Sequence, residues 1–306
     1  MRRITPARLP ETLAFLMRRR ALGRLGTIGA LAMSQNMHGK SVGIRPPRIV
    51  SVGGALTEIV YALEAQSCLV GVDSTSSFPQ QAQLLPQVGY ARRLSAEGIL
   101  ALSPTFVLVT EEAGPAEVLR QVSNVGVPVK VMDSGYRFEG LVQRITRIGR
   151  LLSCEAKANA LIERLSLEWS EVCLSVFHHS TVRPRVLFLF AHSTSRLMAA
   201  GIQTGANAMI EYAGAINATS GFTGYKPLTP ESLIAAQPDI ILLTEHGFQA
   251  LGEHASMLKL PGLSQTPAGR AQRIAVMDAT LLLGFGPRLP MAVQQLNAQF
   301  RTSVIT

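Results

Sequence analysis

The amino-acid sequence predicts an α/β protein of two Rossmann-like lobes, each built on a central sheet, joined by one long rigid α-helix. Three observations lead to this fold. Strands and helices alternate from residue 47, a stretch of about forty residues without proline interrupts them, and part of the chain repeats. With 306 residues, 47% of them hydrophobic, the chain is long enough to bury a large core.

The first lobe, residues 46–138, is predicted from short apolar runs that alternate with helical patterns. Leu56, Ile59 and Leu63 fall on one helix face, directly after a strand that ends in two glycines, PRIVSVGG. We expect strands at 47–54, 69–73, 105–110 and 127–133, and helices at 55–65, 96–102 and 116–126. Strands that alternate with helices indicate a parallel sheet covered on both faces.

The segment 139–178 is predicted to be the connecting helix. It contains no proline, and its apolar residues recur with helical spacing, with a possible bend near Gly149. The second lobe, residues 183–306, restarts the strand–helix alternation with RPRVLFLF at 183–190 and ends in the helix PMAVQQLNAQF.

An internal repeat relates the two lobes. Each copy contains a Gly-Tyr loop, a capped helix, a proline turn and a buried strand. The matching pairs are Tyr90 and Tyr225, Ser95 and Thr229, Glu97 and Glu231, Pro104 and Pro238, and Thr110 and Thr244. Because ligands of such folds bind beyond the carboxyl ends of the strands, we expect two similar rims to face each other across a cleft.

The basic charge of the chain is concentrated at its start. Residues 1–32 hold seven arginines and one glutamate, a net charge of +6, which leaves about +3 of the total +9 for the remainder. That remainder has no basic stripe interleaved with aromatic residues, so the sequence gives no support for nucleic-acid binding.

Residues 1–32 have the layout of an export signal. A basic region is followed by a short apolar run from Leu25 and by the small-residue end Ala30-Leu31-Ala32, so cleavage is expected near Ala32. The pair Arg19-Arg20 is similar to a twin-arginine signal, although the general secretory route, a start at Met17 and a retained amphipathic helix remain alternatives. The mature protein is therefore expected in the periplasm.

Several kinds of active site find no support. The three cysteines show no metal-binding spacing, and the six histidines do not share a helix face. The motifs GxSxG, HExxH and GxGxxG are missing, and so is the GxxxxGK[ST] loop. We therefore expect a binding protein and not an enzyme.

Tyr90, in the stretch VGYARR, is the main candidate for chemistry. A loop tyrosine is more often an ordinary surface residue, but this one follows a glycine and precedes two arginines. A phenol, with a pKa near 10, binds a metal at neutral pH only when its anion is stabilised, and Arg92 would supply that stabilisation. Phenolate is a hard oxygen ligand that suits ferric iron, and tyrosine is a known axial ligand of haem.

Four stretches resemble the periplasmic haem-binding proteins of bacterial haem ABC importers, a helical-hinge (class III) family of binding proteins. They are SVGGALTEIVYAL, LPQVGYARRLSAEGILALSP, GFTGYKPLTPESLIAAQPDIILL and LLLGFGPRLP, and the resemblance spans nearly all of 47–300. It implies a monomer that receives ferric haem b as transported ligand from an outer-membrane receptor. It would pass the haem to the permease and ATPase of an ABC importer.

The resemblance also implies roles for individual residues. Tyr90 would be the axial ligand of the haem iron, and Arg92 would support its phenolate. Glu97 and Glu231 would dock the permease; the alternative for each is a plain helix-capping residue. Further haem contacts are expected from His192, Tyr225, His246 and Arg288, although His192 can instead be an ordinary loop histidine. His246 stands where many relatives have arginine, so it would be a propionate partner or a second axial ligand, or would weaken that contact.

Two alternatives stay open at this level. A ferric siderophore or cobalamin receptor would share the same fold, and an exported α/β enzyme could use Tyr90 as a general acid. No candidate base for such an enzyme stands near Tyr90 in the sequence.

Overall fold

The structure is a computed structural model of the chain and describes residues 46–133, 135–179, 183–193, 196–252 and 256–305. The expected export signal, residues 1–32, lies outside these ranges. Within them, no helix is both long and apolar enough to cross a membrane.

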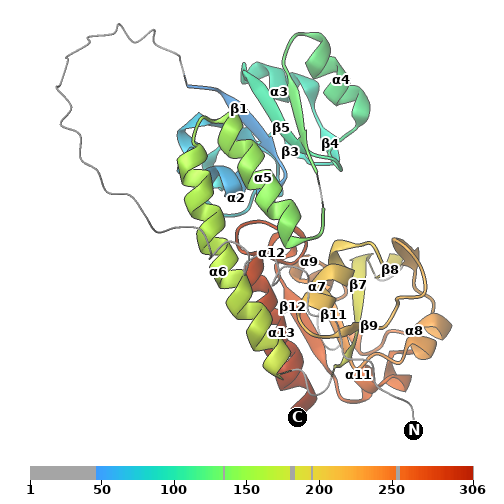
Figure 1. Cartoon of the computed structure of the whole chain (residues 1–306). Helices are drawn as coiled ribbons and strands as arrows, with labels where there is room; N and C mark the ends of the chain where they lie inside the picture. Colours follow the sequence, from blue (N-terminus) through green and yellow to red (C-terminus); the bar gives the residue numbers. More distant parts are fainter. Residues whose placement is uncertain (1–45, 134, 180–182, 194–195, 253–255, 306) are drawn as a thin grey trace, which may run out of the picture. The chain divides into compact units, whose positions relative to one another are not determined.

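The N-terminal lobe is built on a four-stranded, all-parallel sheet with the order β2-β1-β5-β6. Figure 1 labels its two central strands, β1 and β5. The central strands are buried along nearly their whole length, as the apolar runs predicted. A separate two-stranded antiparallel hairpin, β3-β4, follows β2 in the chain. The strands are β1 (Ile49–Val52), β2 (Leu69–Val72), β3 (Gly89–Tyr90), β4 (Arg93–Leu94), β5 (Phe106–Thr110) and β6 (Val129–Met132).

The C-terminal lobe contains a six-stranded mixed sheet with the order β10-β8-β7-β11-β12, in which β9 also pairs with β7. The strands are β7 (Arg185–Ser193), β8 (Arg196–Ala200), β9 (Ile216–Asn217), β10 (Tyr225–Pro227), β11 (Ile240–Thr244) and β12 (Ile274–Met277). The predicted strand–helix alternation is wrong here, because β8 follows β7 directly and runs antiparallel to it. So short a connection can only make a hairpin, since parallel neighbours need a crossover of a dozen or more residues.

Helices cover these sheets, as predicted for an α/β fold. In the first half of the chain they are α2 (Gly54–Ala62), α3 (Ala96–Ala101), α4 (Ala116–Asn124), α5 (Phe138–Leu151) and α6 (Glu155–His179). In the second half they are α7 (Gly205–Tyr212), α8 (Pro230–Ala236), α9 (Glu245–Ala250), α11 (Pro267–Arg270), α12 (Ala279–Leu283) and α13 (Leu289–Ile305).

A long helix does join the two sheets, but it is shorter than the predicted 139–178. The chain forms α5, turns, and continues as α6, which packs against both α5 and α13 (Figure 1). Ser153 has a positive φ of 52° at the turn, and the Cys154 amide donates to the Gly149 carbonyl. A Cβ on Gly149 would lie 2.5 Å from the Ala158 Cβ, so the glycine allows the two helices to meet closely.

The two repeated helices begin alike, as the repeat predicted. The Ser95 hydroxyl accepts a hydrogen bond from the Gly98 amide at the start of α3. Thr229 forms a capping box with Ser232 at the start of α8. These side chains satisfy amide donors that a helix start otherwise leaves unpaired.

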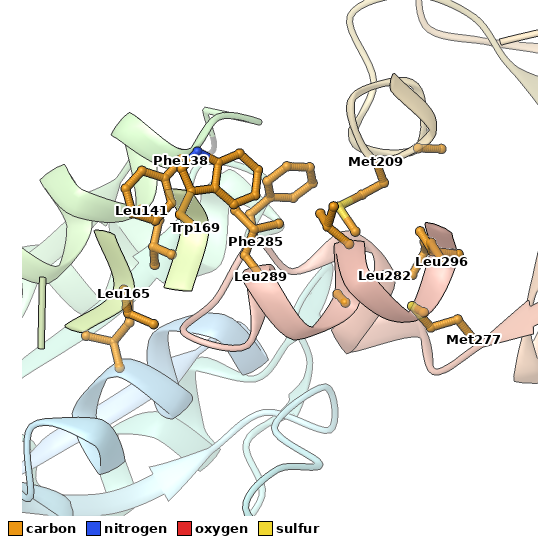
Figure 2. Packing of buried hydrophobic residues seen from close by; sticks show 14 of the residues in the cluster. Phe138, Leu141, Leu165, Trp169, Met209, Met277, Leu282, Phe285, Leu289 and Leu296 are labelled. Atoms are coloured by element: carbon orange, nitrogen blue, oxygen red, sulfur yellow. The ribbon is translucent and has the colours of Figure 1, made fainter. Parts of the chain in front are cut away.

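A single apolar cluster connects the two lobes through α6. The Trp169 ring of α6 stacks on Phe138 at a centroid distance of 5.1 Å (Figure 2). It also meets the ring of Tyr212 edge-on at 4.8 Å. Phe138 belongs to α5 and Tyr212 to α7, so this tryptophan contacts both halves of the chain. Smaller clusters fill the outer faces of the two sheets.

Candidate functional site

The candidate site begins at the carboxyl edge of the N-terminal sheet. Glu112 follows β5 and Tyr136 follows β6, so parallel pairing brings the two residues to the same edge. The hairpin β3-β4 is fastened to the loop after β5 by two backbone hydrogen bonds. The Gly114 amide donates to the Ala91 carbonyl at 2.9 Å, and the Leu94 amide donates to the Gly114 carbonyl at 3.0 Å.

Tyr90 is presented by this hairpin. Gly89 before it has φ of 109°, and a Cβ there would lie 2.7 Å from the Arg93 carbonyl oxygen. The position therefore requires glycine. The Tyr90 side chain is 47% exposed, so the phenol is available to a ligand and is not packed into the interior.

Arg92, Glu112 and Tyr136 form a hydrogen-bonded chain beside Tyr90. The Arg92 Nη2 donates to Glu112 Oε2 at 2.9 Å, and the Tyr136 hydroxyl donates to Glu112 Oε1 at 2.9 Å. The hydrogen bond that Arg92 donates to Glu112 raises the pKa of Arg92, and Tyr90 and Tyr136 lie close enough to raise it further. Burial and the neighbouring Glu112 carboxylate raise the pKa of Tyr136, which therefore stays a neutral donor.

Tyr225 reaches the same group of residues from the C-terminal lobe. It lies in β10, opposite Ala200 of β8, and its ring centroid is 5.8 Å from that of Phe190. Burial is the main cause that raises the pKa of Tyr225, and the Glu112 carboxylate adds to it while Arg92 opposes it. Arg92 thus interacts electrostatically with Tyr90 of its own lobe and with Tyr225 of the other, and all three are predicted site residues.

Arg288 has a different environment from the one expected of a haem contact. Its guanidinium forms two hydrogen bonds with the Glu58 carboxylate, at 2.9 Å from Nε and at 2.5 Å from Nη2. It also lies over the Phe78 ring at 3.9 Å. The Arg288 side chain is 19% exposed and its charge is already compensated, so a haem carboxylate would have to share it with Glu58.

The two predicted histidines lie at the carboxyl ends of strands in the second lobe. His246 is exposed in the first turn of α9, directly after β11. His192 lies in β7, but its side chain is outside the part that the structure describes. Their roles stay predictions.

Glu97 and Glu231 occupy equivalent positions in the two lobes. Each is exposed in the first turn of its helix, α3 or α8. A backbone amide of its own helix start, together with the Thr229 hydroxyl, lowers the pKa of Glu231. Both glutamates are exposed at the surface, as a docking role requires.

Sequence reasoning missed two members of the site, Glu112 and Tyr136. A signal for them exists, because both stand within three residues of the end of a predicted strand, in TEEAG and in DSGYRF. In a parallel sheet such positions gather at one edge. The searched residues contain no cluster of three or more His, Cys, Asp or Glu that could hold a metal ion.

A cavity of about 510 Å³ lies elsewhere, within the C-terminal lobe. It is lined by apolar side chains of β7, β8 and β11 and by the start of α8, and Tyr90, Arg92 and Tyr225 are not among them. The candidate site is therefore defined by the side chains at the two strand edges and not by this cavity.

Comparison with known proteins identifies the family. The sequence pattern of the periplasmic binding proteins matches residues 49–281, which is most of the chain. The chain belongs to this family. Its members are substrate-binding proteins of ABC importers that work outside the cytoplasm, so the resemblance noted in the sequence and the predicted fold class are both confirmed.

Two solved members of this family are especially similar to the chain. The periplasmic heme-binding protein BhuT, in complex with two hemes, is 42% identical with a TM-score of 0.81, over 84% of this chain and 99% of BhuT. The periplasmic heme-binding protein RhuT from Roseiflexus sp. RS-1, in apo form, is 39% identical with a TM-score of 0.81, over 85% of this chain and 99% of RhuT.

A more distant relative has another ligand in its name. The vitamin B12-binding protein of Pectobacterium atrosepticum is 25% identical over 263 residues, which are 83% of this chain and 88% of that protein. Proteins named for different metal macrocycles therefore resemble this chain, and its own ligand has to be inferred from the residues of the site.

Proposed function

We propose that this periplasmic binding protein captures ferric haem between its two lobes and delivers it to the permease of an ABC importer. The observation that carries the proposal is the half-exposed Tyr90, held by a glycine hairpin two residues before Arg92. Arg92 interacts electrostatically with Tyr90 and with Tyr225 of the other lobe. The similarity to BhuT and RhuT supports haem as the ligand.

The residues of the site fit an iron porphyrin. The Tyr90 oxygen would bind the iron, and the Arg92 cation would favour the anionic form of the phenol. The aromatic rings of Phe190 and Tyr225, tilted by 52° to each other, would contact the apolar porphyrin. His192, His246 and Arg288 remain predicted contacts of the same ligand.

Titration with hemin, followed by absorbance, tests the proposal. We expect a Soret band and a charge-transfer band of a tyrosinate complex. Tyr90→Phe should abolish the charge-transfer band and weaken binding by more than the roughly 10–100-fold that outer-shell changes cause. Tyr61→Phe, which removes a hydroxyl from α2, is the matched control and should behave like the wild type. Equal spectra for the wild type and Tyr90→Phe would refute the assignment.

Cobalamin is the second candidate, favoured by the relative from Pectobacterium atrosepticum. The same titration with cyanocobalamin separates the two ligands. Binding of cobalamin but not of hemin, with no effect of Tyr90→Phe, would replace the haem proposal.

The two exposed glutamates are proposed to dock the permease, one from each lobe. Glu97→Lys and Glu231→Lys should lower haem uptake by reconstituted importer and leave the hemin titration unchanged. Glu117→Lys is the matched control, because Glu117 is also an exposed glutamate in the first turn of a helix. If the control lowers uptake as much as the other two, docking does not depend on these positions.

We also propose that residues 1–32 are removed on export. Sequencing the N-terminus of the exported protein tests this, with a start close after Ala32 as the expected result.

A further inference from the structure

Arg92 forms an ion pair with Glu112, and the exposure of this pair indicates a role other than stabilising the fold. The side chains of Arg92 and Glu112 are 60% and 45% exposed, and ion pairs at such exposed positions add little net stability. An exposed arginine side chain also has many accessible rotamers. The pair therefore matters mainly because it restricts where the Arg92 guanidinium lies.

Tyr136 fixes the other side of the Glu112 carboxylate. Its hydroxyl donates to Oε1 while Arg92 donates to Oε2, so each carboxylate oxygen has its own donor. Glu112 is thus held between two groups and cannot turn freely.

The Tyr136 ring is in turn held by the C-terminal lobe. Its centroid is 5.5 Å from that of Phe285, and a Cβ on Gly205 would lie 3.3 Å from two of its ring carbons. Gly205 begins α7, so the ring lies directly against the backbone of that helix start. The chain of contacts consequently runs from the second lobe through Tyr136 and Glu112 to Arg92.

From these contacts we infer that Glu112, held by Tyr136, is a positioning residue that keeps the Arg92 guanidinium beside the Tyr90 oxygen. The inference rests on the proposed function. A guanidinium has several N–H donors in a planar fork, and Glu112 takes one of them from Nη2. The remaining donors stay available to the phenolate. Because Glu112 already orders the guanidinium, ligand binding does not have to supply the entropy cost of ordering it.

Glu112 could affect haem binding in two ways, by its charge or by positioning Arg92. If Glu112 acted by its charge alone, it would disfavour a phenolate nearby, and removing it would strengthen haem binding. If it acts by position, its removal frees Arg92 and weakens haem binding. The two mechanisms therefore predict changes of opposite sign.

The experiment compares Glu112→Ala, Glu112→Gln and Arg92→Ala, together with the double variant Arg92→Ala/Glu112→Ala. The readouts are haem transfer to apomyoglobin and the position of the charge-transfer band. We expect Glu112→Ala to speed haem loss by roughly 10-fold and to shift the band in the direction that Arg92→Ala does. Glu112→Gln should rescue most of both effects, because its amide oxygen still accepts a hydrogen bond. In the double variant the second change should add almost nothing.

A haem-independent measurement accompanies the spectra. Nuclear magnetic resonance relaxation of the Arg92 Nε–H group in the ligand-free protein should show greater mobility in Glu112→Ala and in Tyr136→Phe than in the wild type. Unchanged mobility, additive effects in the double variant, or tighter haem binding by Glu112→Ala would overturn the inference alone. A wild-type protein without the charge-transfer band would overturn the proposed function, and the inference with it.

Discussion

Replacing Arg288 with methionine should destabilise the protein by about 3 kcal/mol at neutral pH. The change leaves the Glu58 carboxylate, whose side chain is 4% exposed, without the guanidinium that pairs with it. Removing one partner of a buried ion pair typically costs 3–5 kcal/mol. We take about 3 kcal/mol, the lower end of that range, because Arg288 is still partly exposed and Glu58 can take up a proton.

The pH dependence of this variant follows from Glu58. Burial is the largest cause that raises its pKa above the ordinary 4.5, and Arg288 supplies the two effects that lower it. Without Arg288 the pKa rises further, so the folded variant keeps a proton that the unfolded chain has already lost. Stability then falls as the pH rises from the ordinary glutamate range through the raised pKa. Arg288→Met should therefore be more destabilised at neutral pH than near pH 4.5.

Thermal and urea denaturation followed by circular dichroism measure the effect. For a chain of this size, about 3 kcal/mol corresponds to a drop in Tm of about 6–12 °C. Arg120→Met, which breaks an exposed ion pair with Glu117, is the control and should cost less than about 1 kcal/mol. The pair Glu58→Leu/Arg288→Met should recover much of the loss, because it leaves no buried charge. If Arg288→Met is no worse than Arg120→Met, the buried ion pair does not contribute the stability that is assigned to it here.

Three further predictions concern other parts of the chain. Gly89→Ala should strain the hairpin, because its Cβ would lie 2.7 Å from the Arg93 carbonyl oxygen, and should weaken hemin binding in the titration without a comparable loss of Tm. Asp73→Ala should cost about 3 kcal/mol in urea denaturation, since the buried carboxylate accepts from backbone amides and hydroxyl groups that would lose their partner. The pKa of Glu231 is lowered, so the stability that its carboxylate contributes is present above the ordinary glutamate pKa of 4.5 and is lost as the pH falls below it. Glu231→Gln should therefore make stability depend less on pH in this acid range when unfolding is measured as a function of pH.

The sequence predicts much of the fold because its apolar patterns are local. The buried strands β1, β5 and β11 appear as short apolar runs, and the starts of α3 and α8 appear as serine or threonine before glutamate. The antiparallel strands β8 and β10 were missed. Whether two neighbouring strands run parallel or antiparallel depends on the length of the segment that connects them, and amino-acid composition does not show it.

The break between α5 and α6 was predicted only as a possible bend near Gly149, although the sequence contains a further sign of it. Leu141 and Leu161 are both buried, but on one straight helix they would point roughly 200° apart. The same holds for Ile145 and Leu165. A turn between them is what allows both pairs to face the core.

The sequence predicted those site residues that lie together in one loop, but not the contacts between residues far apart in the chain. Tyr90 and Arg92 share one short stretch, and their exposure and proximity could be expected. The pairing of Arg92 with Glu112 and that of Arg288 with Glu58 join residues far apart in the chain. No local pattern indicates which carboxylate each arginine will meet.

The apolar cluster that passes through α6 makes the two lobes one cooperative unit. A polypeptide that ended after α6 would leave the Trp169 ring without Tyr212 and would expose the apolar face that packs against α13. Engineered chimaeras that exchange a single lobe with another binding protein must therefore carry matching partners for both ends of this helix. Calorimetry of the intact chain should record one melting event where two autonomous modules would give two.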